Sequence, residues 1–192
     1  MSSGEAIQQI GIDGADRAKR WLEGTTRVLH TWTNPEDEAK LTFKWATEGT
    51  FSFDLGGTMY GAELHNKNFF AEVKKYKDAG DQGTEYPKFL AKCYLALKQS
   101  PAYCDHFMWI TWSPFSMTKW SKLMTQPYVA DALRTHDERA LGEKGAEPAP
   151  DHCAAVADRL WIIVLSDKQE ALTLSDAERA ELLKARVLAG NA

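Results

Sequence analysis

The chain has 192 residues, of which 44% are hydrophobic and 26% are charged, values that suit one globular domain with a sizeable core. It contains no apolar run long enough to cross a bilayer, and its first residues lack the basic and apolar segments of a secretory signal, which argues against a membrane or exported protein. Its three cysteines are few and odd in number, so we expect a reducing compartment and a cytoplasmic protein.

The formal net charge of -4 argues against a generally basic nucleic-acid-binding chain, but the charge is unevenly distributed. Between Leu64 and Lys98 there are seven lysines and four carboxylates, whereas from Asp131 onward there are eight basic and twelve acidic residues. Phosphate binding depends on a local patch rather than on total charge, so the basic segment is a candidate nucleic-acid surface. The same lysines would also suit an ordinary solvated face, and both interpretations stay open.

Hydrophobic periodicity predicts helices and strands that alternate along the chain, without an internal repeat. We expect an α/β fold, formed as a single domain over residues 1–192, in which a central mixed β-sheet has helices on both faces. Asp13 is expected to cap the first helix, and Ser175 with Glu178 to form a capping box for the last. Gly56 and Gly57 are expected to end the second strand. The expected elements, in chain order, are a helix at 13–23, strands at 40–46, 51–55 and 69–76, a helix at 85–98, a buried strand at 106–112, helices at 116–125 and 127–141, a loop at 142–150, a buried strand at 160–165 and a helix from 175 onward.

The most informative residues are a carboxylate at the end of one expected strand and an acid and a lysine on the next. Asp54 lies at the end of the strand at 51–55. Side chains alternate along the strand at 69–76, so Glu72 and Lys74 point the same way and lie roughly 7 Å apart along the backbone. If these two strands pair as a hairpin, the three side chains converge, with the backbone carbonyl of Val73 between them.

Two carboxylates and an amine are suited to phosphodiester hydrolysis with a divalent cation. Carboxylate oxygens bind Mg²⁺ or Mn²⁺ and leave coordination positions for water and substrate. A lysine beside the cation can hold the attacking water or stabilise charge on the phosphorus. We therefore expect Asp54, Glu72 and the carbonyl of Val73 to bind the cation, and Lys74 to act in catalysis.

This pattern resembles the motif of the PD-(D/E)XK, or restriction-endonuclease-like, nuclease superfamily, with Asp54 as its first acid, Glu72 as its second and Lys74 as its lysine. The resemblance covers residues 14–98 and implies a restriction-endonuclease-like core, which residues 105–192 would complete with a further strand and helices. Phe53 stands where many relatives have a proline before the first acid.

The resemblance also extends to positions on either side of the strand motif. Gly14-Ala15-Asp16 matches the Gly-Ala-Glu that opens a helix in relatives, which implies Asp16 as an additional metal ligand, with a shorter reach than glutamate. Glu23, seven residues later on the same side of the helix, is the fallback. Some relatives place a glutamine near the helix after the lysine strand, and Gln82 matches that position as an assisting catalytic residue.

The resemblance implies a Mg²⁺- or Mn²⁺-dependent nuclease that hydrolyses phosphodiester bonds in DNA, in a setting such as bacterial or phage genome defence or recombination. Dimers are frequent among relatives, so a homodimer or a protein partner could use the acidic part of the chain from Asp131 onward. The lysines that we expect to bind nucleic acid are Lys67, Lys75, Lys77, Lys119 and Lys122.

A second hypothesis is a noncatalytic module that binds nucleic acid or protein on the same fold. A separate, ordinary explanation of the motif is that Asp54 caps a turn and that Glu72 and Lys74 form a surface ion pair on an edge strand, which contributes little to stability. Binding of a divalent cation through Asp54 and Glu72 distinguishes the two hypotheses, because only the catalyst requires it.

Two further motifs have ordinary explanations that compete with functional ones. Trp109 could be a platform on which bases stack, although aromatic side chains of this kind more often fill a core. The pairs Cys104/His106 and His152/Cys153 contain zinc-ligand residue types, but neither has the spacing of a structural zinc motif.

Overall fold

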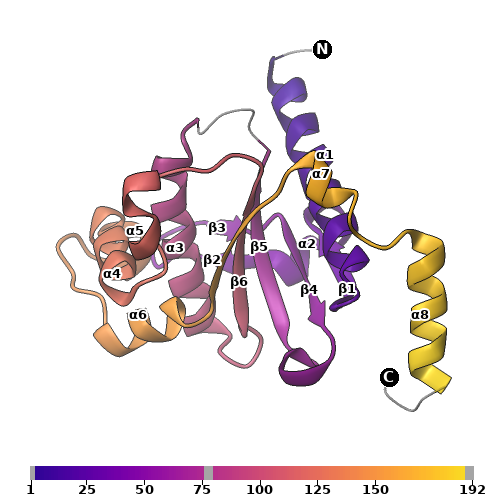
Figure 1. The fold of residues 1–192 in the computed structure, drawn as a ribbon. Coiled ribbons are helices and arrows are strands. Elements are labelled where there is room, and N and C mark those ends of the chain that lie inside the picture. The colour runs from indigo at the N-terminus through magenta and orange to yellow at the C-terminus, as the bar shows by residue number, and fades with distance from the viewer. Residues whose placement is uncertain (1–2, 76–79, 189–192) are drawn as a thin grey trace.

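The computed structural model describes residues 3–75 and 80–188, and its centre is a five-stranded mixed sheet (Figure 1). The strands of this sheet are β1 (Val28–Thr33), β4 (Leu55–Met59), β5 (Asn68–Lys74), β6 (His106–Thr111) and β7 (Leu160–Val164). They lie in the order β1-β4-β5-β6-β7, with β1, β4 and β5 antiparallel and β5, β6 and β7 parallel. A separate antiparallel pair consists of β2 (Thr42–Lys44) and β3 (Thr50–Ser52).

Helices cover both faces of the main sheet (Figure 1). They are α1 (Ser3–Gly24), α2 (Asn34–Leu41), α3 (Gln82–Gln99), α4 (Gln126–Thr135), α5 (Asp137–Leu141), α6 (Pro150–Ala157), α7 (Asp167–Glu170) and α8 (Asp176–Leu188), with the short 3-10 helices η1 (Ala62–Leu64) and η2 (Met117–Lys122). Helices α3 to α6 lie on one side of the sheet, and α1 and α7 lie on the other. This arrangement confirms the expected α/β class. Within residues 3–75 and 80–188, no helix has both the length and the apolar character needed to span a membrane.

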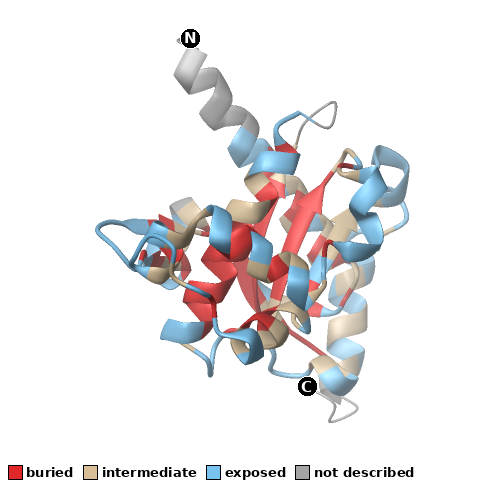
Figure 2. Cartoon of the chain, turned by 90° about the vertical axis from the view of Figure 1, so that its left-hand side faces the viewer, coloured by how far each residue is buried: buried red, intermediate tan, exposed pale blue. Residues whose placement is uncertain are grey.

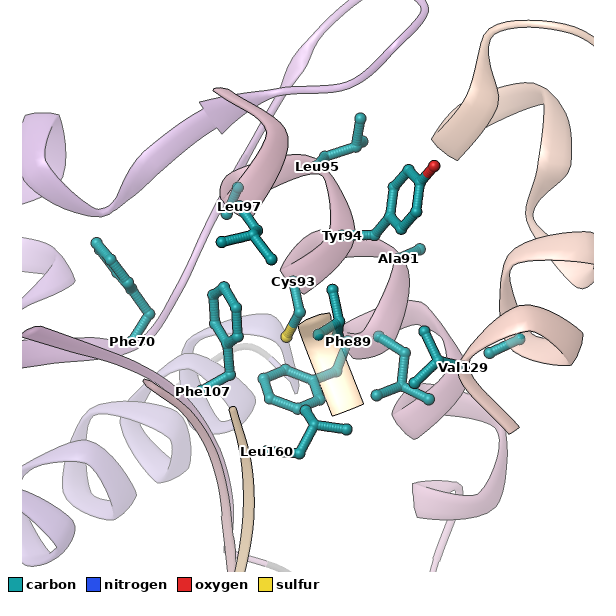
Figure 3. Packing of buried hydrophobic residues seen from close by; sticks show 14 of the residues in the cluster. Phe70, Phe89, Ala91, Cys93, Tyr94, Leu95, Leu97, Phe107, Val129 and Leu160 are labelled. Carbon is teal, nitrogen blue, oxygen red and sulfur yellow. The ribbon is translucent and has the colours of Figure 1, made fainter. Parts of the chain in front are cut away.

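Strand β5 separates two hydrophobic cores because its side chains alternate between the faces of the sheet. Phe70 packs with Phe107 and Cys93 on the side of α3, as Figure 3 shows. Val73 points the other way and joins the core beneath α1. The buried residues in Figure 2 follow the strands and the inner face of α3. Glu72 shares the face of Phe70, so its carboxylate is directed toward α3.

The first part of the chain, up to β2, differs from the expected elements at α1 and in the segment that follows it. Helix α1 begins at Ser3, so Asp13 lies inside the helix and does not cap it, because good helix formers such as Ala6 and Gln8 precede it. Segment 28–39, for which we expected no element, forms β1 and most of α2. Helix α2 continues to Leu41, so the strand expected at 40–46 is limited to β2. The β-branched and aromatic residues of β1 were the signal for that strand.

The strand expected at 51–55 is two strands, since β3 ends at Ser52 and β4 begins at Leu55. Phe53 and Asp54 lie at the break between them. The prediction that Gly56 and Gly57 end a strand was wrong, because both lie inside β4. The next strand and helix agree with expectation, with β5 at 68–74 and α3 at 82–99.

The C-terminal half differs mainly in how its helices divide. The helix expected at 127–141 is interrupted at His136, which separates α4 from α5, and the helix expected at 116–125 is only the 3-10 helix η2. Helix α6 follows the expected loop directly. Strand β6 and the Ser175–Glu178 capping box are confirmed. Strand β7 is present but lies at the sheet edge, with Trp161 exposed, so the expectation that it is buried was wrong.

Gly57 marks a position where three strands approach too closely for a side chain. A Cβ atom there would lie 2.2 Å from the backbone oxygen of His30 on β1 and 2.7 Å from the ring of Phe69 on β5. We expect Gly57→Ala to lower the free energy of unfolding by about 2 kcal/mol, because the backbone of β1 must shift. Gly11→Ala in α1 is the matched control, since a Cβ there meets nothing within 4 Å, and we expect a gain of up to about 1 kcal/mol. Urea unfolding of both variants measures the difference, and equal stabilities would contradict this assignment.

Candidate active site between strands β4 and β5

Asp54 is held by backbone hydrogen bonds at the break between β3 and β4. Its backbone N–H donates to the carbonyl of Ala71 at 3.0 Å, and its carbonyl accepts from the N–H of Asn34 at 3.2 Å. Its Oδ2 accepts from the backbone N–H of Val73 at 2.8 Å. The carboxylate of Asp54 therefore lies beside the residue that separates Glu72 from Lys74.

The hairpin pairing of β4 with β5 produces this approach. Leu55, next to Asp54, pairs with Ala71, the residue before Glu72. The pairing of β4 with β5 ends there, and the N–H of Val73 donates to the side chain of Asp54 instead of to a backbone carbonyl of β4. The carbonyl of Val73 lies on the same edge of β5 as its N–H, because both groups of one strand residue point to one side. It is therefore directed toward Asp54.

Glu72 is buried and accepts hydrogen bonds from two lysines. Its Oε1 accepts from the Nζ of Lys74 at 3.0 Å, and its Oε2 accepts from the Nζ of Lys92 at 2.8 Å. Lys92 also donates to the carbonyl of Ser52 at 3.0 Å, which fixes its ammonium group between α3 and β3. These contacts supply the charge and hydrogen-bond partners without which a buried carboxylate would be costly.

Lys92 is a member of this site that sequence reasoning missed. It lies among the apolar residues of α3 and is itself buried. The signal in the sequence was its spacing, because Glu85, Lys88 and Lys92 are separated by three and four residues and so share one face of the helix. That face meets the end of β5, where Glu85 Oε2 lies 3.9 Å from the Nζ of Lys74.

The ionisation of Asp54 and Glu72 follows from their different surroundings. Burial, together with the nearby charge of Glu72, raises the pKa of Asp54 to about 7, against the lowering effect of the Val73 N–H and the two lysines. Burial would likewise raise the pKa of Glu72, but the ammonium groups of Lys92 and Lys74 outweigh it and lower that pKa below its ordinary value. The two carboxylates are thus close together, and their mutual repulsion raises the pKa of Asp54, whereas the two lysines keep the pKa of Glu72 low.

Asp54→Asn is expected to stabilise the metal-free protein by up to about 4 kcal/mol at neutral pH, because each of the roughly three pKa units between the folded and unfolded states corresponds to about 1.4 kcal/mol. The carboxyl of Asp54 ionises near pH 4 in the unfolded chain and near pH 7 in the folded one, so wild-type stability falls as pH rises through this interval. Asparagine does not ionise and can still accept from Val73. Chemical unfolding with chelator, from pH 4 to above pH 7, should show a difference in the free energy of unfolding between Asp54→Asn and the wild type that grows with pH. A difference independent of pH would show that it does not arise from ionisation of Asp54.

The chemistry of this donor set fits a hard divalent cation. Two carboxylates in close proximity, one of them with a raised pKa, present negative charge that such a cation would neutralise. Within residues 3–75 and 80–188, no three His, Cys, Asp or Glu side chains are close enough to hold a metal ion together. A cation at Asp54 and Glu72 would therefore take further ligands from the carbonyl of Val73, water or substrate, as Mg²⁺ does when bound by one or two carboxylates.

The acids expected on the first helix do not join this group. Gly14 of α1 packs against Val73 and Lys75, on the face of the sheet opposite the side chain of Glu72. Asp16, two residues later, is exposed. Glu23, the fallback, instead accepts from Thr31 and Arg179. The expectation of a helical acid near the two strand acids was therefore wrong, because a helix packed over Val73 holds its side chains away from Glu72.

Gln82 is buried at the start of α3 and has a supporting position. Its Oε1 accepts from the indole N–H of Trp109 at 3.3 Å, and its Nε2 donates to the carbonyl of Ser113 at 3.2 Å. The Nζ of Lys74 lies 5.7 Å from the centre of the Trp109 ring. Gln82 thus orients the ring beneath Lys74, and its side-chain hydrogen bonds are directed to β6 and the loop after it rather than to the two acids.

The lysines expected to bind nucleic acid are distributed over different parts of the surface. Lys67 precedes β5 and pairs with Asp105 at 3.1 Å, roughly 20 Å along the strand from Lys74, so it does not border the site. Lys75 lies against α1 on the opposite face. Lys77 lies outside the described residues. Lys119 and Lys122 are exposed on η2.

The competing interpretations of Trp109 and of the cysteines are also decided by burial. Trp109 is fully buried in the α3-side core, so it is not a platform for bases. Cys104 and Cys153 are buried without a disulfide, and burial raises the pKa of Cys104 to about 12. His152 contacts the carbonyl of Tyr94 at 2.9 Å. Among the described residues, these side chains do not assemble into a zinc site.

Comparison with known proteins adds no assignment to this geometry. No family model matches the chain, and neither a curated protein nor a solved structure is similar to it. Any functional assignment therefore rests on the side chains themselves.

Proposed function

We propose that the chain is a metal-dependent nuclease with a PD-(D/E)XK-like active site formed by Asp54, Glu72 and Lys74. The observation that supports it best is the hydrogen bond from the Val73 N–H to Asp54, which holds one acid beside the Glu72-Val73-Lys74 segment that carries the other acid and the amine. The mixed sheet with helices on both faces is also compatible with the restriction-endonuclease-like core that the sequence resemblance implies.

In this proposal each residue has a distinct task. Asp54 and Glu72, with the carbonyl of Val73, hold a Mg²⁺ or Mn²⁺ ion, which when bound neutralises phosphate charge and makes a water molecule more acidic. Lys74 donates hydrogen bonds to the attacking water or to a phosphate oxygen. Lys92 remains behind Glu72 and fixes its carboxylate. Gln82 keeps Trp109, and with it the apolar surface beneath Lys74, in place.

The substrate proposed is nucleic acid, because the basic segment 64–98 contains Glu72, Lys74 and Lys92. DNA is placed first because the sequence resemblance implies it. The test is incubation of the purified chain with circular DNA, linear DNA and RNA, in Mg²⁺, in Mn²⁺ and in chelator. Cleavage that needs the cation and leaves a 5'-phosphate is the expected result. Cleavage that continues in chelator would contradict the proposal, as would the absence of cleavage on every substrate.

A noncatalytic binding module is the second candidate, and one observation favours it. Both carboxylate oxygens of Glu72 accept from ammonium groups, so the side chain is fully paired without a cation. Calorimetric titration with Mn²⁺ distinguishes the candidates. The nuclease should bind Mn²⁺ in the wild type and lose that binding in Glu72→Gln, whereas a module that uses Glu72 only as an ion-pair partner should bind in neither. Such a module could use its acidic part from Asp131 onward to contact a protein partner or a second copy.

A further inference from the structure

Beside the candidate site, residues 117–124, which include η2, form an exposed ridge. Three large apolar side chains on it are exposed: Met117 by 67%, Trp120 by 39% and Met124 by 44%. Lys119 and Lys122 are exposed among them. Several large apolar side chains exposed in one short segment indicate a binding surface, because burying them against a partner would be favourable.

The ridge is held rigidly by buried aromatic residues at its base. Phe115, just before the ridge, and Leu123, within it, are almost fully buried. The hydroxyl of Tyr86 donates to the carbonyl of Leu123 at 3.1 Å, and the ring of Phe115 lies 5.3 Å from the ring of Tyr86. Trp120 leans on Phe115 with ring centres 6.2 Å apart. The backbone that presents the exposed side chains is thus anchored to the core at both ends of the ridge.

A short series of contacts connects the ridge to the proposed catalytic residues. Gln82 bonds to Ser113, just before the ridge, and to Trp109. The ring of Trp109 in turn lies beneath Lys74. A Cβ placed on Gly83 would be 3.7 Å from the Oγ of Ser116, so the start of α3 packs directly on the start of the ridge. Lys74 pairs with Thr111 at the end of β6, and the ridge follows that strand, so the ridge and Lys74 belong to the same end of the sheet.

The charge of this part of the chain fits a polyanion. From His106 to Ala130 the sequence contains no Asp or Glu, while Lys119 and Lys122 lie on the exposed ridge. Exposed lysines alternating with a tryptophan and methionines combine phosphate contacts with flat or polarisable surfaces for bases. In a duplex the base faces are stacked on one another, so such surfaces are useful only for unpaired bases.

We propose that the ridge 117–124 binds single-stranded nucleic acid by stacking unpaired bases on Trp120 and Met117 while Lys119 and Lys122 contact the phosphates. This inference rests on the proposed function, because it names single strands or frayed ends as the substrate class of the same site. It assigns Trp120 to substrate binding and leaves the chemistry to Asp54, Glu72 and Lys74.

Fluorescence anisotropy in chelator, with a labelled oligothymidine and a duplex of equal length, tests the ridge independently of catalysis. We expect the double variant Met117→Ala/Trp120→Ala to bind the single strand about tenfold more weakly, which corresponds to about 1.4 kcal/mol, and the duplex equally well. Trp120→Phe should keep most of the affinity. Lys119→Ala/Lys122→Ala should weaken binding of both probes and reduce the salt slope per lysine by about 0.7 for the single strand and about 0.9 for the duplex.

Trp161→Ala is the matched control, because Trp161 is exposed to a similar extent, 37%, but lies on the edge strand β7. Its affinity for single strands should equal that of the wild type, and thermal melting should confirm that each variant is folded. The proposal of single-strand binding at the ridge would be overturned if Met117→Ala/Trp120→Ala bound the single strand within twofold of the wild-type affinity. It would also be overturned if this variant lost as much affinity for the duplex as for the single strand. If the chain binds single strands through the ridge but cleaves no substrate, the ridge proposal holds and the nuclease proposal is rejected. If the chain cleaves with a cation but its single-strand binding does not depend on the ridge, the nuclease proposal holds and the ridge proposal is rejected.

Discussion

Lys74→Met is expected to fold, to bind Mn²⁺ and to cleave nucleic acid at least a hundredfold more slowly than the wild type. A positioned donor at the reacting phosphate contributes on the order of 10²- to 10³-fold in rate, and Lys74 is the amine that lies beside Glu72 at the proposed metal site. Glu72 keeps Lys92 as a partner in this variant, so its carboxylate stays in place. Initial rates on a fluorescent oligonucleotide, at saturating Mg²⁺ and again at saturating Mn²⁺, measure the effect.

Lys88→Met is the control for this loss of rate. Lys88 lies one turn before Lys92 on α3, its side chain is exposed by 42%, and its ammonium group lies 4.0 Å from Glu85. Its removal changes the local charge by the same amount and should reduce the rate no more than a few-fold. A Lys74→Met enzyme with more than a tenth of wild-type activity would exclude Lys74 from catalysis. Equal losses of rate in the two variants would show that Lys74 contributes only its positive charge to this part of the surface.

Lys92→Met is expected to lower the free energy of unfolding by about 3 kcal/mol, which is large for one substitution. The change leaves the buried carboxylate of Glu72 with Lys74 alone and deprives the carbonyl of Ser52 of a donor. Methionine fills a similar volume, so lost packing contributes little. Urea unfolding at neutral pH in chelator gives the value, and Lys88→Met again serves as the exposed control.

A double-mutant cycle separates the ion pair from other effects of removing Lys92. With Glu72→Gln already in place, no buried charge remains for Lys92 to compensate. The double variant should therefore be more stable than the sum of the single losses predicts, by at least about 1 kcal/mol. Strict additivity of the two losses would show that Lys92 stabilises the fold by a route other than Glu72.

The sequence was sufficient to predict the approach of Asp54, Glu72 and Lys74 because that approach depends on local rules. Alternation along one strand puts Glu72 and Lys74 on one face, and a short connection lets the preceding strand return as a hairpin. The α/β class followed from the same periodicity. These features need no knowledge of distant contacts.

Other parts of the site depend on tertiary packing and could not be predicted in the same way. Lys92 meets Glu72 only because α3 crosses the sheet at one particular angle, and a lysine in an apolar stripe does not reveal that angle. Asp16 was expected near the site from a short match, but packing of Gly14 on Val73 puts α1 on the opposite face. The glycines after Asp54 were interpreted as a strand end, whereas Gly57 is required by the close approach of β1 and β5.

The origin of the two lysines from different elements has a consequence for the order of folding. Strands β4 and β5 are close in sequence, so their hairpin can form while Glu72 is still hydrated. Lys92 arrives only when α3 docks over β5, and in that step a carboxylate and an ammonium group lose their water together. The pairing of Glu72 with both lysines, on which the proposed function depends, is complete only after α3 has docked against the sheet.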